Sequence, residues 1–268
     1  MVREPAVAGK FYPANPQVLS SDVASYLSPA AEEKTAAIGC VVPHAGYIYS
    51  GKVAGAVFSA IDIPSHCIVL CPNHTGRGHP LALMSQGTWR TPLGEVALDS
   101  ELATSLLKVF PALTEDAEAH RSEHAIEVEL PFLQILRPGV QVVPIAVGTS
   151  RWLLLEQLGQ AIAATIQSFQ FPVLMVASSD MNHYEDDDTT RRKDHKAIRK
   201  IASLDPQALY DTVINESISM CGFGPAVAML IAAKQLGATE ARLVQYATSA
   251  DTSGDKEMCV GYAGIVVS

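Results

Sequence analysis

Four apolar segments of the chain end abruptly at side chains that can bind a metal or transfer a proton. They end at His44, at His74, at Asp180 followed by His183, and at Asp251. In an open α/β sheet the C-terminal ends of parallel strands meet along one edge, where ligands bind, so we expect these side chains to converge. Two imidazoles and one carboxylate form a ligand set for a non-haem divalent metal with open positions. A further histidine beside them suits acid–base chemistry, because imidazole titrates near neutral pH.

Each of these side chains also has a simpler interpretation. A single histidine after a strand is commonly a hydrogen-bonded loop residue, but recurrence at three strand ends favours a shared site. Asp180 follows two serines, and capping a turn is as good an interpretation as a role in the site. The other histidines outside this set are expected at the surface or in loops: His66, His79, His120 and His195.

Two more side chains, His124 and Cys221, are candidates of the same kind. If the segment around His124 is helical, His124 shares a face with Glu127, as part of the pocket wall or as a polar pair beneath a loop. Cys221 precedes a glycine-containing helix start, where a thiol can be reactive, although a buried structural thiol is the simpler interpretation. The acidic run 185–188 is interpreted as a solvated helix start rather than a cation site.

The elements that must position these side chains follow from the hydrophobic pattern. Continuous apolar runs are typical of strands covered on both faces, and helical patterns alternate with them. We therefore predict one domain over residues 1–268, an α/β/α sandwich with a mostly parallel or mixed central sheet. The predicted strands are Ala37–Val42, Cys67–Cys71, Gln141–Val147, Pro172–Ala177, Ala241–Tyr246 and Val260–Val267. The predicted helices are Lys52–Ala60, Ser100–Val109, Glu123–Arg137, Trp152–Ser168, Asp188–Leu204, Pro206–Ile214 and Pro225–Leu236.

Two segments depart from a simple alternation of strands and helices. Ala82–Ala97 contains short strands and turns, which indicate an antiparallel excursion or an edge hairpin. Pro131 removes a backbone donor from the pattern Glu123–Arg137, so we expect a break there or a helix that begins near it. Asp205 followed by Pro206 marks a helix start, with a capping carboxylate and a proline in the first helical position.

Composition narrows the classes of function. The 268 residues carry 19 basic and 28 acidic side chains, a net charge of −9 with histidine neutral. We expect neither nucleic acid nor an anionic membrane surface as a partner, because proteins bind these anionic surfaces through a stripe of basic residues that this sequence lacks. No apolar segment reaches the ~20 residues of a bilayer span, and no signal segment follows Met1. Five cysteines, an odd number, indicate reduced thiols, so we expect a cytoplasmic protein.

Short motifs along nearly the whole chain occur in the order of one known family. They are Arg3 with Ala8–Pro13, Val42–Tyr47 with Tyr49–Gly51, Pro72–His74, Glu123–Glu127, Ser178–Asp180 with His183, Cys221-Gly222, and Tyr246 through Gly254-Asp255 to Val260–Ala263. By these motifs the chain resembles the Memo family, specifically the bacterial and archaeal branch called AmmeMemoRadiSam system protein B. That family is in turn similar in fold to the catalytic subunits of class III extradiol ring-cleaving dioxygenases.

The resemblance implies a ligand set for the metal. His44 and His74 would be two of the ligands. The dioxygenases use a carboxylate as the third ligand, whereas animal Memo proteins place a cysteine near the end of the chain, at the position of Thr252 here. Asp251, next to that position, is the expected third ligand, and Asp255 is the reserve candidate. Fe(II) is the favoured metal, with copper and zinc as the other candidates.

Two functions from different classes follow from the resemblance. In the first, an oxidoreductase of the extradiol type, His183 matches the acid–base histidine of the dioxygenases, and His124 and Asp180 orient substrate or ligands. In the second, a non-enzymatic scaffold uses the same crevice for a phosphorylated or other anionic ligand, because animal Memo proteins are described as phosphopeptide adaptors. The family name implies a radical-SAM protein and an AMMECR-type protein as system partners. The oligomeric state stays open, a homo-oligomer included.

Overall fold

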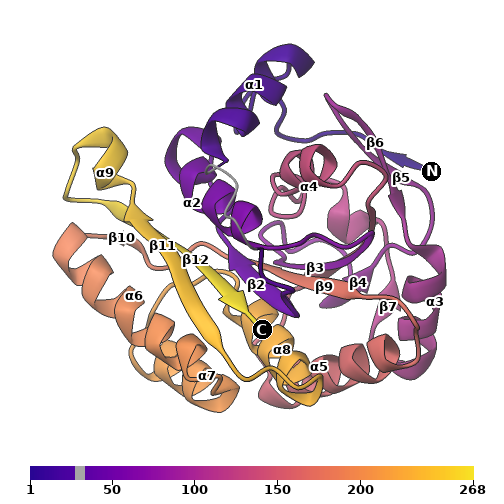
Figure 1. Cartoon of the computed structure of the whole chain (residues 1–268). Coiled ribbons are helices and arrows are strands. Elements are labelled where there is room, and N and C mark those ends of the chain that lie inside the picture. The colour runs from indigo at the N-terminus through magenta and orange to yellow at the C-terminus, as the bar shows by residue number, and fades with distance from the viewer. Residues whose placement is uncertain (28–33) are drawn as a thin grey trace.

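One mixed β-sheet forms the centre of the structure (Figure 1), a computed structural model that describes residues 1–27 and 34–268. The strands are β1 (Val2–Arg3), β2 (Gly39–Val42), β3 (His66–Pro72), β4 (Leu81–Leu83), β5 (Thr88–Thr91), β6 (Gly94–Leu98), β7 (Thr114–Glu115), β8 (Gln141–Val147), β9 (Val173–Ser178), β10 (His183–Glu185), β11 (Ala241–Thr248) and β12 (Cys259–Val267). Along the main path of the sheet their order is β1-β5-β6-β8-β3-β9-β2-β12-β10, with β11 beside β12 and β4 beside β8 and β7.

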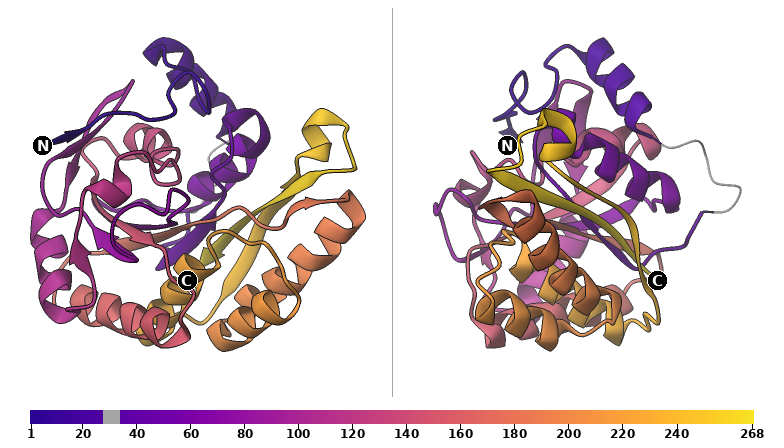
Figure 2. Two further views of the ribbon diagram at one scale, coloured as in Figure 1. Left: turned by 180° about the vertical axis from the view of Figure 1, so that it is seen from behind. Right: turned by 90° about the vertical axis from the view of Figure 1, so that its left-hand side faces the viewer.

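Helices cover both faces of this sheet (Figure 2). They are α1 (Pro16–Tyr26), α2 (Tyr47–Ala60), α3 (Ser100–Val109), the 3-10 helix η1 (Glu118–His120), α4 (Leu130–Leu136), α5 (Trp152–Gln167), α6 (Asp187–Ala202), α7 (Pro206–Asn215), α8 (Phe223–Gln235) and α9 (Ala250–Ser253). α1, α2 and α4 pack on one face, and α3, α5, α6, α7 and α8 pack on the other. The predicted α/β/α sandwich is confirmed.

The continuous apolar strands divide their side chains between two cores. In β3, Ile68 and Leu70 belong to the core beneath α5 and α8, whereas Val69 and its neighbouring cysteines belong to the core beneath α2 and α4. Successive side chains of a strand point to opposite faces, so a strand covered on both sides must be apolar at every position. Among the described residues, no helix has the length and apolar character needed to cross a bilayer.

Most predicted elements are present, and the exceptions have local causes. The segment 82–97 contains the antiparallel hairpin β5–β6, and Asp205 caps α7 by accepting the N–H of Ala208. Within the predicted helix Glu123–Arg137, the expected helix start near Pro131 is confirmed, because α4 begins at Leu130 with Pro131 in its first turn, whereas the residues before it do not form a helix. Helix α1 was missed, since only two of its side chains, Leu19 and Val23, are buried and its apolar stripe is narrow.

Strand β12 lies between the parallel strands at the centre of the sheet and the strands β10 and β11 at its edge. The C-terminal part of β12 pairs with β2, and its first residues pair with β10, while β11 runs along its other edge. All three pairings are antiparallel. β11 therefore lies two strand spacings from β2, which is roughly 10 Å.

A buried carboxyl, Asp194 of α6, attaches the helix to this end of the sheet. Its Oδ1 accepts the backbone N–H of Asn182 at 2.8 Å, and its Oδ2 accepts the hydroxyl of Tyr246 at 2.7 Å. Burial raises the pKa of Asp194 to about 7, although these two hydrogen bonds oppose the shift. The folded protein therefore keeps a proton on Asp194 in a pH range where the unfolded chain has lost it.

This proton makes the contribution of Asp194 to stability depend on pH. Between about pH 4 and pH 7 the unfolded state is ionised at Asp194 and the folded state is not, so the free energy of unfolding falls as the pH rises. Relative to an Asp194→Asn variant, the wild type is expected to lose up to roughly 4 kcal/mol across this range. Urea unfolding at several pH values measures the difference, with the exposed Asp62→Asn as control. A pH-independent difference between wild type and Asp194→Asn would refute it.

Candidate metal centre

The parallel neighbours β2, β9 and β3 end at one edge of the sheet and carry the central side chains of the site. His44, His74 and Asp180 each lie two residues beyond the end of their strand. β9 pairs in parallel with both β2 and β3, so the three strand ends are adjacent. The ring centroids of His44 and His74 are 5.1 Å apart. Parallel pairing thus brings together side chains that are up to 136 positions apart in the chain.

These side chains open into a cavity of about 300 Å³ that also contains His124 and His183. The His124 ring centroid lies 4.7 Å from that of His74 and 5.4 Å from that of His44. Five of the predicted site residues therefore line one cavity. The remaining lining residues are Phe11, Ala45, Gly46, Tyr184, Val260 and Tyr262.

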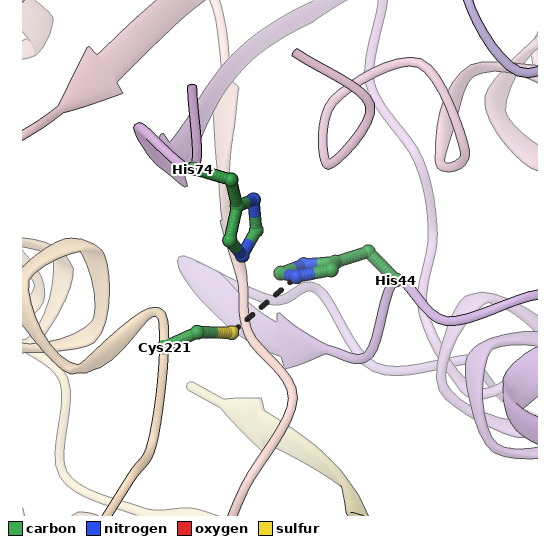
Figure 3. A group of neighbouring side chains, drawn as sticks. All are labelled: His44, His74 and Cys221. Atoms are coloured by element: carbon green, nitrogen blue, oxygen red, sulfur yellow. Dashed lines mark hydrogen bonds between the residues drawn. The ribbon is translucent and has the colours of Figure 1, made fainter. Parts of the chain in front are cut away.

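The third possible metal donor beside the two strand-end imidazoles is a thiol, Cys221 (Figure 3). Its Sγ lies 3.4 Å from Nε2 of His44, and ligand atoms of His44, His74 and Cys221 all lie within 4.8 Å of one another. The backbone N–H of Asp180 donates to this sulfur at 3.3 Å. Two imidazoles and one thiolate match the donors that transition metals accept in proteins, so the residues present fit such an ion.

The approach of Cys221 to the strand ends depends on Gly222. A Cβ atom at Gly222 would lie 2.3 Å from the carbonyl oxygen of Ser178 and 2.4 Å from Cβ of Ser179, closer than atoms pack. Only glycine lets the backbone before α8 lie against the end of β9 in this way. The sequence pattern indicated a reactive or a buried structural thiol at Cys221, not a metal ligand. The glycine that follows it is the one sequence feature that points to a close approach of this segment to the strand ends.

Asp251 does not join the other predicted ligands. Its Oδ1 accepts from Nη2 of Arg191 and its Oδ2 accepts the backbone N–H of Thr248, both at 2.8 Å, and half of its side chain is exposed. It follows β11, and β12 separates that strand from β2. Thr252 and Asp255 are exposed on the same projecting segment, where Thr252 donates to the carbonyl of Ile48 and Asp255 accepts the N–H of Glu257. The placement of Asp251 in the metal site is therefore corrected.

A buried carboxylate orients the imidazole of His74. Glu123 accepts from Nδ1 of His74 at 2.9 Å and from the backbone N–H of His74 at 2.6 Å. Burial favours a higher pKa for Glu123, but the hydrogen bond and charge of His74 outweigh it and lower the pKa. A carboxylate can only accept, so Nδ1 of His74 carries the proton and Nε2 is left free for a metal.

A hydroxyl performs the same task for His44. Its Nδ1 lies 2.8 Å from Oγ of Ser178, and its backbone N–H donates to Oδ1 of Asp180 at 2.8 Å. Burial, together with the nearby imidazoles of His74 and His124, lowers the pKa of His44 well below its usual value. Burial likewise raises the pKa of Asp180 to about 7. The lowered pKa of His44 keeps its imidazole neutral near neutral pH, and the neutral imidazole is the form that binds metals.

His183 presents one ring nitrogen to the cavity with a defined protonation. Its Nδ1 lies 2.9 Å from the carbonyl oxygen of Ser219, which can only accept, so Nδ1 carries the hydrogen. The backbone N–H of His183 donates to Oγ of the same serine at 2.7 Å. Burial lowers the pKa of His183, which keeps Nε2 unprotonated near neutral pH. Such a nitrogen can accept a proton from a bound molecule.

His124 and Glu127 do not share the cavity wall. His124 packs edge-on against Phe11 with ring centroids 4.8 Å apart, and burial lowers its pKa. Glu127 is fully buried and instead accepts from Tyr12 and from the backbone of the N-terminal segment. The expected surface or loop position of His120 is also wrong in part, because the ring lies in the core against Trp89.

Comparisons with known proteins agree with this architecture. The family model described as Memo-like protein matches residues 3–266. MEMO1 family proteins of Methanopyrus kandleri and Archaeoglobus fulgidus are 40% and 42% identical to the chain, each alignment covering 99% of both proteins. One from Pyrobaculum arsenaticum is 41% identical over 99% of the chain and 98% of the relative.

A solved structure shares the fold at low sequence similarity. The crystal structure of the uncharacterized protein JW3007 from Escherichia coli K12 superposes with a TM-score of 0.55 at 14% identity, covering 83% of this chain and 98% of that one. This likeness concerns the fold alone. Since the family model and the archaeal relatives both extend over nearly the full length, the chain belongs to the Memo family.

Proposed function

We infer that the protein is a metal-dependent oxidoreductase whose metal is held by His44, His74 and Cys221. The observation that carries this proposal is the meeting of these three donors beside a cavity that His44 and His74 line together with acid–base groups. Three protein ligands leave a position for substrate, which is the pattern of catalytic rather than structural metal sites. A bound first-row transition metal would supply Lewis-acid and redox chemistry at that position.

The donor set widens the choice of metal. The predicted set of two histidines and one carboxylate favours Fe(II), whereas a thiolate in place of the carboxylate also suits copper and zinc. Fe(II) stays a candidate, because imidazole and thiolate both ligate iron in proteins. Comparative binding of the three metals decides among them.

Residues around the donors have distinct tasks in the proposed reaction. His183 accepts the proton of a substrate hydroxyl at Nε2 and returns it later, while the carbonyl of Ser219 holds its other nitrogen. Asp180 anchors the backbone of His44, and His124 packs edge-on against Phe11 in the wall of the cavity. The cavity of about 300 Å³ favours a small substrate, such as a single hydroxylated ring.

The alternative of a scaffold that binds an anionic ligand has less support. Phosphate recognition depends on arginine, lysine or clustered backbone N–H donors. Neither arginine nor lysine is among the described residues that line the cavity. The imidazoles of His44, His124 and His183 have lowered pKa values, chiefly from burial, so they supply little positive charge at neutral pH. The pKa of His74 is raised, because its contact with Glu123 outweighs the effect of burial, but the carboxylate of Glu123 offsets the charge that His74 gains.

Metal titration tests the proposal directly. Metal-free wild-type protein is titrated anaerobically with Fe(II), Cu(I) and Zn(II), and calorimetry is expected to show one tight site per chain for at least one metal. A His44→Ala/His74→Ala variant should lose that site, whereas His79→Ala, which replaces an exposed histidine, should retain it. Equal binding by the double variant and the wild type would end the proposal.

Turnover provides the second arm of the test. The loaded protein is incubated with a panel of catechols, and dioxygen consumption is followed with an electrode. A His183→Gln variant is expected to bind the metal normally but to turn over about 10²–10⁴-fold more slowly, because it lacks the proton acceptor. Tight binding of inorganic phosphate by the metal-free protein, with no turnover by the loaded protein, would favour the scaffold instead.

A further inference from the structure

One buried acid, Glu129, has no part in the reaction described so far. It lies at the N-terminal end of α4, fully buried, and its Oε1 is 3.0 Å from Oγ of Ser178. Its Oε2 is also buried and has no hydrogen-bond partner among the described residues. An ionised carboxylate in the core with one oxygen that accepts no hydrogen bond would be very unfavourable, because burial penalises an unpaired charge.

The electrostatic surroundings of Glu129 also favour the neutral acid. The titratable groups that interact with it are Asp180, Tyr47 and Cys40, and none of them is a cation. Burial is the main cause that raises the pKa of Glu129 well above its usual value, and the charge of Asp180 adds to it, while the hydrogen bond with Ser178 opposes it. No countercharge therefore compensates an ionised Glu129.

Counting hydrogens at Ser178 leads to the same state by an independent route. Its Oγ has three polar neighbours: the carbonyl oxygen of Ala125 at 2.7 Å, Nδ1 of His44 at 2.8 Å and Oε1 of Glu129 at 3.0 Å. A hydroxyl has one hydrogen to donate and two lone pairs to accept with. The carbonyl of Ala125 can only accept, so it takes the single hydrogen of Ser178 at the shortest distance. The other two neighbours must then both donate.

We propose that Glu129 is a positioning residue, a neutral carboxylic acid that donates to Ser178 and so keeps Ser178 as the acceptor for Nδ1–H of His44. Both lone pairs of the serine are then occupied and its hydrogen is committed to Ala125. His44 is held in the tautomer whose Nε2 lacks a hydrogen, and this is the nitrogen nearest the sulfur of Cys221. Ser178 thus accepts from Nδ1–H of His44, as the carboxylate of Glu123 accepts from Nδ1–H of His74. The difference is that the acceptor for His44 is a hydroxyl whose role is set by the neutral acid Glu129.

Only the consequence for metal affinity rests on the proposed function. The protonation of Glu129 and the tautomer of His44 are properties of the metal-free chain and can be measured on it. A failure to bind metal would therefore overturn the proposed function and leave both of these measurements meaningful.

Infrared spectroscopy tests the protonation state. At about pH 9, above the pKa of about 7 of both Asp180 and Asp194, the wild-type spectrum should still contain the C=O stretch of a protonated carboxylic acid. The band should vanish in Glu129→Gln and persist in the exposed control Glu101→Gln. A wild-type spectrum without this band, or a band that Glu129→Gln leaves unchanged, would overturn the proposal.

Nitrogen NMR and metal affinity test the positioning role. Long-range proton–nitrogen correlation should show Nδ1–H for His44 in the wild type and in Glu129→Gln, because an amide NH₂ also donates to Ser178. Glu129→Met removes the donor, and we expect mixed tautomers of His44 with about tenfold weaker metal binding, at the low end of the effect of an outer partner. Glu129→Gln should bind metal within about threefold of wild type. Equal affinity and unchanged His44 signals in Glu129→Met would refute the positioning role.

Discussion

Replacing Cys221 with alanine is expected to weaken metal binding by more than about 100-fold, whereas Asp251→Asn should leave it unchanged. Loss of an outer partner of a metal ligand already costs 10–100-fold, and a direct ligand contributes more. The sulfur lies within 4.8 Å of a ring nitrogen of each of the two imidazoles, close enough for one ion to bind all three, whereas the carboxylate of Asp251 is paired with Arg191 and belongs to no such group among the described residues. Calorimetric titration of the metal-free proteins with Fe(II), Cu(I) and Zn(II) measures both variants.

Spectroscopy separates loss of a ligand from loss of structure. The wild type loaded with cobalt(II) should show a thiolate-to-metal charge-transfer band that is absent in Cys221→Ala and intact in Asp251→Asn. Both variants should unfold with nearly wild-type free energy in the absence of metal, because Cys221 makes only weak sulfur hydrogen bonds and the ion pair of Asp251 with Arg191 is partly exposed. The reverse pattern, with a weakened Asp251→Asn and an unaffected Cys221→Ala, would restore the carboxylate as the third ligand.

The second large effect is expected on stability, from the buried ion pair of Arg3 with Glu127. Both side chains are almost fully buried, and Glu127 also accepts from Tyr12 at 2.6 Å and from the N–H groups of Ala6 and Val7 at 2.8 and 3.0 Å. An Arg3→Met variant leaves this carboxylate without its cation in the core. We expect the free energy of unfolding to fall by about 3–5 kcal/mol, the usual cost of breaking a buried pair from one side.

An exposed ion pair provides the matched control. Arg90 contacts Glu4 and Glu95, each at 2.7 Å, but all three side chains are largely solvated. Arg90→Met should therefore change the unfolding free energy by less than about 1 kcal/mol in urea titrations. A double variant, Arg3→Met with Glu127→Leu, should regain part of the stability lost in Arg3→Met, because no unpaired charge remains. Similar losses for Arg3→Met and Arg90→Met would contradict the assignment.

The same ion pair connects the N-terminal segment to the candidate metal centre. Arg3 donates from Nε to the carbonyl of His120 and from Nη2 to the carbonyl of Glu123, whose carboxylate orients His74. Two hydrogen bonds, one at each end of Glu123, therefore connect Arg3 to the imidazole of His74. The sequence motif around Arg3 thus has a structural task at the site, although Arg3 does not line the cavity.

Local sequence patterns determined much of the fold and two of the three candidate metal donors. Continuous apolar runs predicted the buried strands, because side chains that alternate between two covered faces must all be apolar. The ends of those runs located His44, His74 and Asp180, since parallel strands deliver their C-terminal residues to one edge. The helix start at Asp205 was also predicted, because a capping carboxylate acts on backbone N–H groups within three residues, and the acidic run 185–188 was predicted as a helix start without its capping residue, Asp186.

Only the tertiary structure decided which distant side chains complete the site. Asp251 also follows a strand, but β12 lies between β11 and β2, and no local pattern encodes that lateral order. Cys221 reaches His44, 177 positions away, because Gly222 lets its loop lie against the end of β9. Hydrophobic period reports which face of an element is buried, whereas the identity of its neighbour depends on non-local packing and hydrogen bonds that exist only in the folded chain.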